Sequence, residues 1–141
     1  MRRASFLSLT LVAVLALTSV GCDSGENTPT TPTTPGPTVT ETFAGTLTVN
    51  GAATFTFATT TTGIITATLR SIAPVATAQV GLAIGTWNGV SCTVQLVNDR
   101  ITAGLAVTAQ VNAANASLCV RIYDVGQLTE TATFEVVVVH P

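Results

Sequence analysis

The stretch from Thr42 to Phe57, TFAGTLTVNGAATFTF, decides the fold class because its apolar side chains alternate with threonine at a period of two. In an extended chain, Phe43, Leu47 and Val49 point to one side, and Thr42, Thr46 and Thr48 point to the other. Alternation over short runs is typical of β-strands with one buried face. The stretch therefore predicts strands at the start of the folded region.

The same alternation continues through the rest of the sequence. Valine, isoleucine and threonine are branched at Cβ, which favours extended over helical backbone. About eight short strands follow one another with no amphipathic helix between them, which predicts an all-β fold: a single antiparallel β-sandwich of jelly-roll-like or Greek-key type. The later apolar positions expected to face its core are Phe55, Phe57, Ile65, Ala67, Leu69, Val80, Leu82, Ile84, Val94, Leu96, Leu105, Val107, Ala109, Leu118, Val120, Ile122, Phe134, Val136 and Val138.

Turn-forming residues separate these runs. Asn50-Gly51 stands between two alternating segments and predicts a hairpin, because both residues tolerate positive φ. The segment 112–116 is compatible with a short helical turn or with a loop. The four consecutive valines 136–139 predict a central strand that is buried on both faces. Further turns are expected at Asn88-Gly89, Asn98-Asp99 and Asp124-Val125-Gly126.

The first 22 residues have the three parts of a secretory signal: Arg2 and Arg3, the apolar stretch 6–17, and small residues before Cys22. The apolar stretch is shorter than the roughly 20 residues that a membrane-spanning helix needs. Ser19-Val20-Gly21-Cys22 resembles the lipobox of bacterial lipoproteins. That resemblance implies cleavage before Cys22, a diacylglyceryl thioether on its sulfur, a fatty acyl chain such as palmitate on its amine, and an exported chain anchored to the cell-envelope membrane. The alternative is an ordinary cleaved signal with Cys22 as a free thiol.

Threonine and proline dominate the segment 24–40, SGENTPTTPTTPGPTVT. It has no apolar face to bury, and its prolines remove the amides that a sheet requires. An extended, polyproline-like tether is therefore expected. The predicted organisation is a signal segment at 1–21, an acylated cysteine with its tether at 22–41, and one β-sandwich domain at 42–141.

Two cysteines remain once Cys22 is assigned to lipid. In an exported protein, the remaining pair, Cys92 and Cys119, predicts a disulfide. Cys119 alternates with the apolar Leu118 and Val120 and so lies on the face away from the core, whereas Cys92 has the same parity as the core-facing positions of its own run. A bulge or a strand-end position is expected to bring the two sulfurs together.

Charge is scarce, because only 9% of the residues are charged and lysine is absent. Without a basic cluster, the chain has no surface for nucleic acid or for anionic lipid headgroups. The single histidine, His140, is expected to be solvated, and no set of ligands suits a metal or another cofactor. An enzyme is therefore not expected. The acids from residue 42 onward, expected to be solvated, are Asp99, Asp124, Glu130 and Glu135.

Two aromatic side chains are the candidates for ligand binding. Trp87 precedes Asn88-Gly89, so it ends a strand at a turn, where an exposed ring is able to stack on a sugar or a peptide. Tyr123 is the second candidate, and packing in the core remains the alternative for both rings. Arg121 lies between apolar neighbours and is expected to pair with Glu135 across a hairpin.

Two stretches resemble bacterial pre-peptidase C-terminal domains, which are small β-sandwiches: 45–57, and 119–124 with 133–138. That resemblance implies an accessory or binding role. The expected function is a membrane-anchored, non-catalytic module that binds a glycan, a peptide or an envelope protein. The alternative is a structural or assembly subunit of an envelope complex. A solvent-exposed Trp87 beside a groove would favour ligand binding, and a long unpaired edge strand or a wide apolar face would favour assembly.

Overall fold

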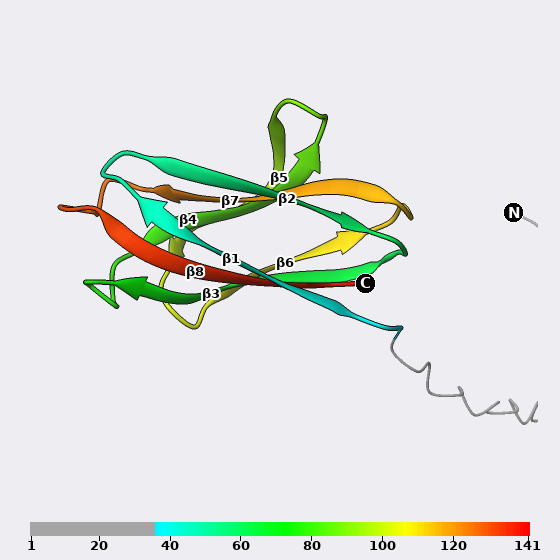
Figure 1. Ribbon diagram of the computed structural model, residues 1–141, viewed down its shortest axis with the longest axis horizontal. Helices are drawn as coiled ribbons and strands as arrows, with labels where there is room; N and C mark the ends of the chain where they lie inside the picture. Colours follow the sequence, from blue (N-terminus) through cyan, green and yellow to red (C-terminus); the bar gives the residue numbers. More distant parts are fainter. Residues whose placement is uncertain (1–35) are drawn as a thin grey trace, which may run out of the picture. The chain divides into compact units, whose positions relative to one another are not determined.

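The computed structural model describes residues 36–141, which form eight β-strands and no helix (Figure 1). The all-β prediction is confirmed for these residues. The predicted leader, Cys22 and the predicted tether as far as residue 35 lie outside the described residues. The strands are β1 (Val39–Leu47), β2 (Ala52–Thr59), β3 (Gly63–Ala73), β4 (Val80–Trp87), β5 (Cys92–Ile101), β6 (Ala106–Val111), β7 (Ala116–Asp124) and β8 (Ala132–His140).

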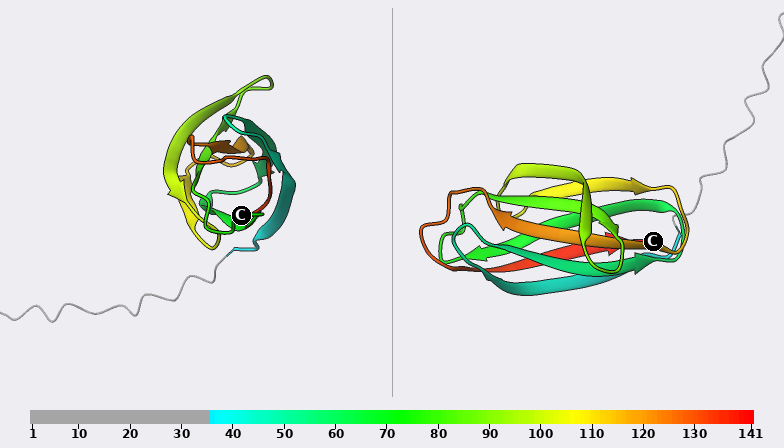
Figure 2. Two further views of the ribbon diagram at one scale, coloured as in Figure 1. Left: turned by 90° about the vertical axis from the view of Figure 1, so that its left-hand side faces the viewer. Right: turned by 90° about the horizontal axis from the view of Figure 1, so that it is seen from above.

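The strands form two four-stranded antiparallel sheets that face each other (Figures 1 and 2). Sheet A has the order β1-β8-β3-β6, and sheet B has the order β2-β7-β4-β5. The first strand pairs with the last, the second with the seventh, the third with the sixth and the fourth with the fifth. This is one long hairpin rolled into two sheets, so the fold is the jelly-roll type of sandwich.

The predicted hairpin at Asn50-Gly51 is wrong. β1 and β2 lie in different sheets, so these residues carry the chain from sheet A to sheet B. The local turn is nevertheless present: Asn50 has a φ of 56°, and Gly51 donates its N–H to the carbonyl oxygen of Thr48 at 2.9 Å. A few residues determine the turn, but long-range pairing determines which sheet the next strand joins.

The other predicted turns have mixed outcomes. Asn88-Gly89 joins β4 to β5, which pair in sheet B, so this hairpin is confirmed. The turn after β7 is also confirmed, and the segment 112–115 is a turn without a helix, with Ala116 already in β7. Asn98-Asp99 is not a turn, because it lies inside β5 where the register with β4 shifts. The polar pair therefore marks a β-bulge, in which one strand carries extra residues without ending.

The core lies between the sheets and takes its side chains from both. On the β1–β2 side, the ring of Phe55 stacks on Phe43 at 5.0 Å between centroids and meets Phe134 edge-on at 6.0 Å. The buried members of the cluster are Leu47, Phe57, Ile65, Ala67, Leu69, Ile72, Val80, Leu82, Ile84, Ile101, Val107, Val111, Leu118, Val120, Ile122, Leu128, Ala132, Phe134, Val136 and Val138.

β8 contains the four valines that predicted a strand buried on both faces. The strand is central, between β1 and β3, as predicted. Val136 and Val138 are buried, but Val137 and Val139 are only half-buried. They lie on the outer face of sheet A, which no third layer of the described chain covers, so the prediction holds for one face only.

β1 begins at Val39, three residues before the predicted start of the domain at residue 42. Val39, Thr40 and Glu41 pair with the last residues of β8, from His140 back to Val138. The segment is polar and follows the prolines, so its composition resembles the tether. Pairing with a distant strand is what makes it part of the sheet.

His140 is not solvated, which corrects the expectation from the sequence. Its side chain is 2% exposed, because β8 keeps pairing as far as this residue and turns the ring inward. Nε2 of His140 lies 3.0 Å from Oε1 of Glu41, and the ring packs 5.1 Å from that of Phe57. The histidine therefore ties the first strand to the last.

Candidate functional site

The outer face of sheet B carries an unusual strand. In β4, large side chains point into the core at Val80, Leu82 and Ile84. The alternate positions, Gly81, Ala83 and Gly85, point outward and are nevertheless buried. Small residues leave room for a close approach. Residues of the neighbouring strands β5 and β7 therefore pack against the outer face of β4.

The ring of Tyr123 fills the space above Gly81. Tyr123 lies directly opposite Gly81 on the neighbouring strand β7. A Cβ atom at position 81 would overlap this ring, so only glycine fits beneath it. The tyrosine hydroxyl then reaches across β4 and donates a hydrogen bond to Asp99 on β5. Tyr123 therefore connects β7 to β5 over the top of β4.

β5 itself covers the outer side of Gly85. A Cβ at Gly85 would overlap the main chain of Thr93, so the glycine is required for this close approach. The register shifts at the same place, since Ile84 pairs with Leu96 whereas Gly85 pairs with Val94. The extra residue of this β-bulge is Gln95.

The bulge changes which side chains of β5 face outward. Val94 lies opposite Gly85 and Val97 lies opposite Ala83, so both valines share the outer face although they are three residues apart. They are 41% and 48% exposed, and Leu96 is also 41% exposed. The expectation that Val94 faces the core is therefore wrong. Leu96 lies opposite the core-facing Ile84, as its predicted direction requires, but it is not buried. β5 is an edge strand that bends away from the sandwich (Figure 1).

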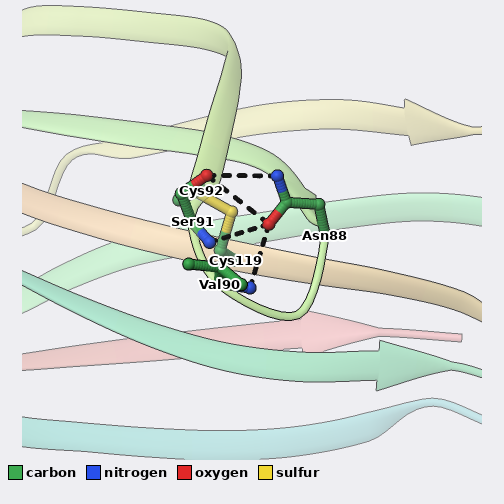
Figure 3. The surroundings of a disulfide bond; sticks show 5 residues. All are labelled: Asn88, Val90, Ser91, Cys92 and Cys119. Atoms are coloured by element: carbon green, nitrogen blue, oxygen red, sulfur yellow. Dashed lines mark hydrogen bonds between the residues drawn. A yellow bond between two sulfur atoms is a disulfide. The ribbon is translucent and has the colours of Figure 1, made fainter.

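The predicted disulfide between Cys92 and Cys119 is present, with 5.8 Å between the two Cα atoms (Figure 3). Cys119 points away from the core as expected, yet it is fully buried because the start of β5 lies over it. The adjoining hairpin loop is ordered by Asn88, whose Oδ1 accepts the N–H groups of Val90 and Ser91 at 2.9 and 2.8 Å. The disulfide and this loop hold the bent end of β5 in place.

A cleft of about 290 Å³ remains on this outer face between β5 and β7, and we call it the outer-face cleft. Its floor is Ala83, and its walls are Val94, Val97, Arg121 and Tyr123. The guanidinium carbon of Arg121 lies 6.0 Å from the centre of the Tyr123 ring, within the range of a cation–π interaction. The cleft thus combines an apolar floor, an aromatic edge and one positive charge.

The environment of Tyr123 keeps its hydroxyl protonated. Burial raises the pKa of this phenol to about 12, and the hydrogen bond to Asp99 and the negative charge of Asp99 act in the same direction. The nearby Arg121 opposes them in part. At neutral pH, Tyr123 is therefore a hydrogen-bond donor to Asp99 and not a nucleophile or a base.

Arg121 does not pair with Glu135, which corrects the prediction from the sequence. Glu135 lies in sheet A and pairs with Arg70, with 3.1 Å between Nη1 and Oε1. Arg121 lies in sheet B, on the outer face. Within residues 36–141 the ion pairs are Arg70–Glu135 and His140–Glu41, so the guanidinium of Arg121 has no carboxylate partner there.

Trp87 and Tyr123, the two predicted binding residues, are not brought together. Both point to the outer side of sheet B, but Trp87 lies six residues along β4 from Gly81, which is roughly 20 Å of strand. Trp87 is half-buried at the end of β4 and is not among the residues that line the outer-face cleft. Tyr123 does line that cleft, together with Val97 and with Val94, which the sequence had placed in the core.

Two further clefts offer less chemistry. One, of about 370 Å³, lies between the loops before β4 and before β8, with Glu130 as its only charged lining residue. The other, of about 320 Å³, opens between β4 and β6 and is lined mainly by small and apolar residues such as Ala109, Ala113 and Leu118. Neither contains an aromatic side chain.

The remaining acids are dispersed. Asp124 has a structural role: Oδ1 accepts the N–H groups of Gly126, Gln127 and Leu128, and Oδ2 accepts that of Asn50 at 2.8 Å. Burial acts to raise its pKa, but these four backbone donors outweigh it and lower the pKa. In the part of the chain that the structure describes, no group of three histidine, cysteine, aspartate or glutamate residues is placed to hold a metal ion.

Comparison of the sequence with protein-family models and with curated proteins gave no match. The structure contains no helix long and apolar enough to cross a membrane among residues 36–141. The arguments about function therefore rest on the site itself.

Proposed function

We propose that this chain is a lipid-anchored, non-catalytic module of the cell envelope that binds a polypeptide partner through β5 and the adjoining outer face of sheet B. The anchor is the acyl group expected on Cys22, and the domain is the jelly-roll sandwich. The proposal includes no catalytic step, because the side chain of His140 contacts Glu41 and the hydroxyl of Tyr123 donates to Asp99.

The observation that carries the proposal is the exposure of β5. The eight residues from Thr93 to Arg100 are all exposed, and three of them are the large apolar residues Val94, Leu96 and Val97. β5 is also an edge strand, so one side of its backbone has no partner strand within sheet B. Exposed apolar side chains on an open edge favour contact with another polypeptide.

A glycan is the less favoured ligand. Sugar rings usually require a flat, accessible aromatic face, and Trp87 was the candidate for that role. Trp87 is half-buried beside the hairpin, and Tyr123 is fixed over Gly81 by its bond to Asp99. Both placements favour a polypeptide over a sugar.

Site-specific photo-cross-linking in cells that export the chain tests this function. A cross-linking residue at position 96 should give a polypeptide adduct in the membrane fraction. The matched control is position 64, because Ile64 is another apolar side chain, 61% exposed, on β3 of sheet A. The additional substitution Val97→Asp should reduce the adduct at position 96 severalfold, whereas Ile64→Asp should not.

The identity of the adduct separates the two proposed roles. A cross-link to a different polypeptide supports a binding or accessory module, and a cross-link to a second copy supports the alternative of an assembly subunit. Equal adducts at positions 96 and 64, or no adduct at either, would contradict a role for β5.

A further inference from the structure

We infer that the outer-face cleft binds the C-terminal residue of a polypeptide partner, with the α-carboxylate on Arg121 and an apolar last side chain between Val94 and Val97. This inference rests on the proposed function and names the part of the partner that is recognised. The sequence assigned Tyr123 to ligand binding without choosing among a glycan, a peptide and an envelope protein, and it did not bring Arg121 and the valines into one site.

The positive charge of the cleft favours a negatively charged group on the ligand. Arg121 is the only charged residue among those that line the cleft, and it is exposed. Within residues 36–141 it takes part in neither of the two ion pairs. A planar guanidinium matches a carboxylate through two parallel hydrogen bonds. An anionic carboxylate is therefore the group that complements this end of the cleft.

Asp99 and Arg121 carry opposite charges, so they favour one orientation of a charged ligand in the cleft. The carboxylate of Asp99 accepts the hydroxyl of Tyr123, which forms one wall of the cleft, and Asp99 itself is not among the lining residues. A negative group on the ligand is repelled by Asp99 and attracted to Arg121. Burial keeps Tyr123 neutral by raising its pKa, so the ring contributes an apolar surface next to Arg121 without adding charge.

The size and shape of the cleft favour a chain end over an acidic side chain. A volume of about 290 Å³ accommodates one residue and little more. In an extended peptide, neighbouring side chains point to opposite faces, so an acidic residue and its apolar neighbour cannot both enter one cleft. A C-terminal residue carries its carboxylate and its side chain on the same Cα atom, which places both beside Arg121 and the valines.

The open edge of β5 supplies the remaining contact. A partner that runs toward the cleft along β5 meets unpaired backbone groups of an edge strand, as in peptide recognition by strand addition. The bulge at Gln95 limits the length of such pairing. We therefore expect specificity to come mainly from the last residue of the partner.

The test is an NMR titration of the full exported chain with three short peptides. The first is acetyl-Gly-Ser-Leu with a free carboxylate, the second is the same peptide as its C-terminal amide, and the third is acetyl-Leu-Ser-Asp-amide, whose only carboxylate is on a side chain. The first peptide should bind about 10-fold more tightly than the second, because the amide replaces a charge-assisted hydrogen bond to Arg121 by a neutral contact. It should also bind severalfold more tightly than the third. The NMR chemical-shift changes on binding should be largest at Val94, Val97 and Tyr123.

Arg121→Gln should abolish the preference for carboxylate over amide. The matched control is Arg100→Gln, which removes the same charge from an exposed arginine on β5 outside the cleft and should keep the preference. Equal affinity for acid and amide, equal affinity for the first and third peptides, or equal loss in both variants would overturn the inference. If these results occur while the cross-link at position 96 persists, the inference fails and the proposed function stands.

Discussion

β4 and β5 are neighbouring strands joined by one hairpin, yet their environments are opposite. The residues of β4 from Val80 to Gly85 are all buried, whereas those of β5 from Thr93 to Arg100 are all exposed. Both sequences carry alternating apolar residues. The alternation identifies a strand, but it does not reveal how much of that strand the rest of the molecule covers.

Position in the sheet explains the difference. β4 has β7 on one side and β5 on the other, and the side chains of sheet A cover its inner face. β5 has a neighbour on one side only and carries a β-bulge at Gln95. β4 is held by burial, whereas β5 is held by backbone pairing, a disulfide and the Tyr123–Asp99 bond.

The largest expected effect comes from replacing one leucine in each strand by alanine. Leu82→Ala in β4 should lower the free energy of unfolding by about 4 kcal/mol, because it leaves a cavity in the core. Leu96→Ala in β5 should lower it by less than about 1 kcal/mol, since the side chain is already 41% exposed. Urea titration of the full chain measures both values. Equal losses would mean that β5 is covered in solution, as in a stable dimer, and the contrast would disappear.

The disulfide gives the next largest effect. Replacing both Cys92 and Cys119 by serine should lower the free energy of unfolding by about 3.5 kcal/mol, the chain-entropy value for a loop of this length. Amide hydrogen exchange should accelerate more in β5 than in β4, because β5 loses the link that holds its bent end. Cys22→Ser, the matched control, should leave both measurements unchanged. Unaltered exchange in β5 would show that pairing alone fixes the strand.

Much of the fold could be predicted from the sequence because its signals are local. Alternation at a period of two identifies the strands, and two cysteines that remain beside Cys22 in a chain expected to be exported predict the disulfide. The pairing of β1 with β8 has no local signal, because it joins residues about a hundred positions apart. For the same reason, Asn50-Gly51 was interpreted as a hairpin although it connects the two sheets.

The candidate site was predicted only in part. Tyr123 was singled out as an aromatic residue on a strand, and it lines the outer-face cleft. Val94 was placed in the core because simple alternation cannot account for the extra residue of a bulge. The alternation of small and large residues in VGLAIG, 80–85, was a usable signal. Small outward-facing residues indicate that another part of the chain covers the outer side of β4.

The smallest expected effect concerns the side-chain bond between Tyr123 and Asp99, which ties β7 to β5. Tyr123→Phe should lower the free energy of unfolding by about 1 kcal/mol, the usual net contribution of one hydrogen bond. Because the pKa of the phenol is raised from 10.0 to about 12, the bond contributes fully below pH 10 and its contribution is lost as the pH rises through 12.

Tyr123 is the only tyrosine of the chain, so ultraviolet absorbance follows its ionisation without interference. The folded chain should titrate near pH 12, and the chain unfolded in urea should titrate near pH 10. Asp99→Asn should move the folded midpoint toward 10, because it removes the negative charge that opposes the phenolate. A midpoint near 10 in the folded wild-type chain would mean that Tyr123 does not hold β5. The outer-face cleft would then lose the wall that fixes its shape, and β5 would be held by backbone pairing and the disulfide alone.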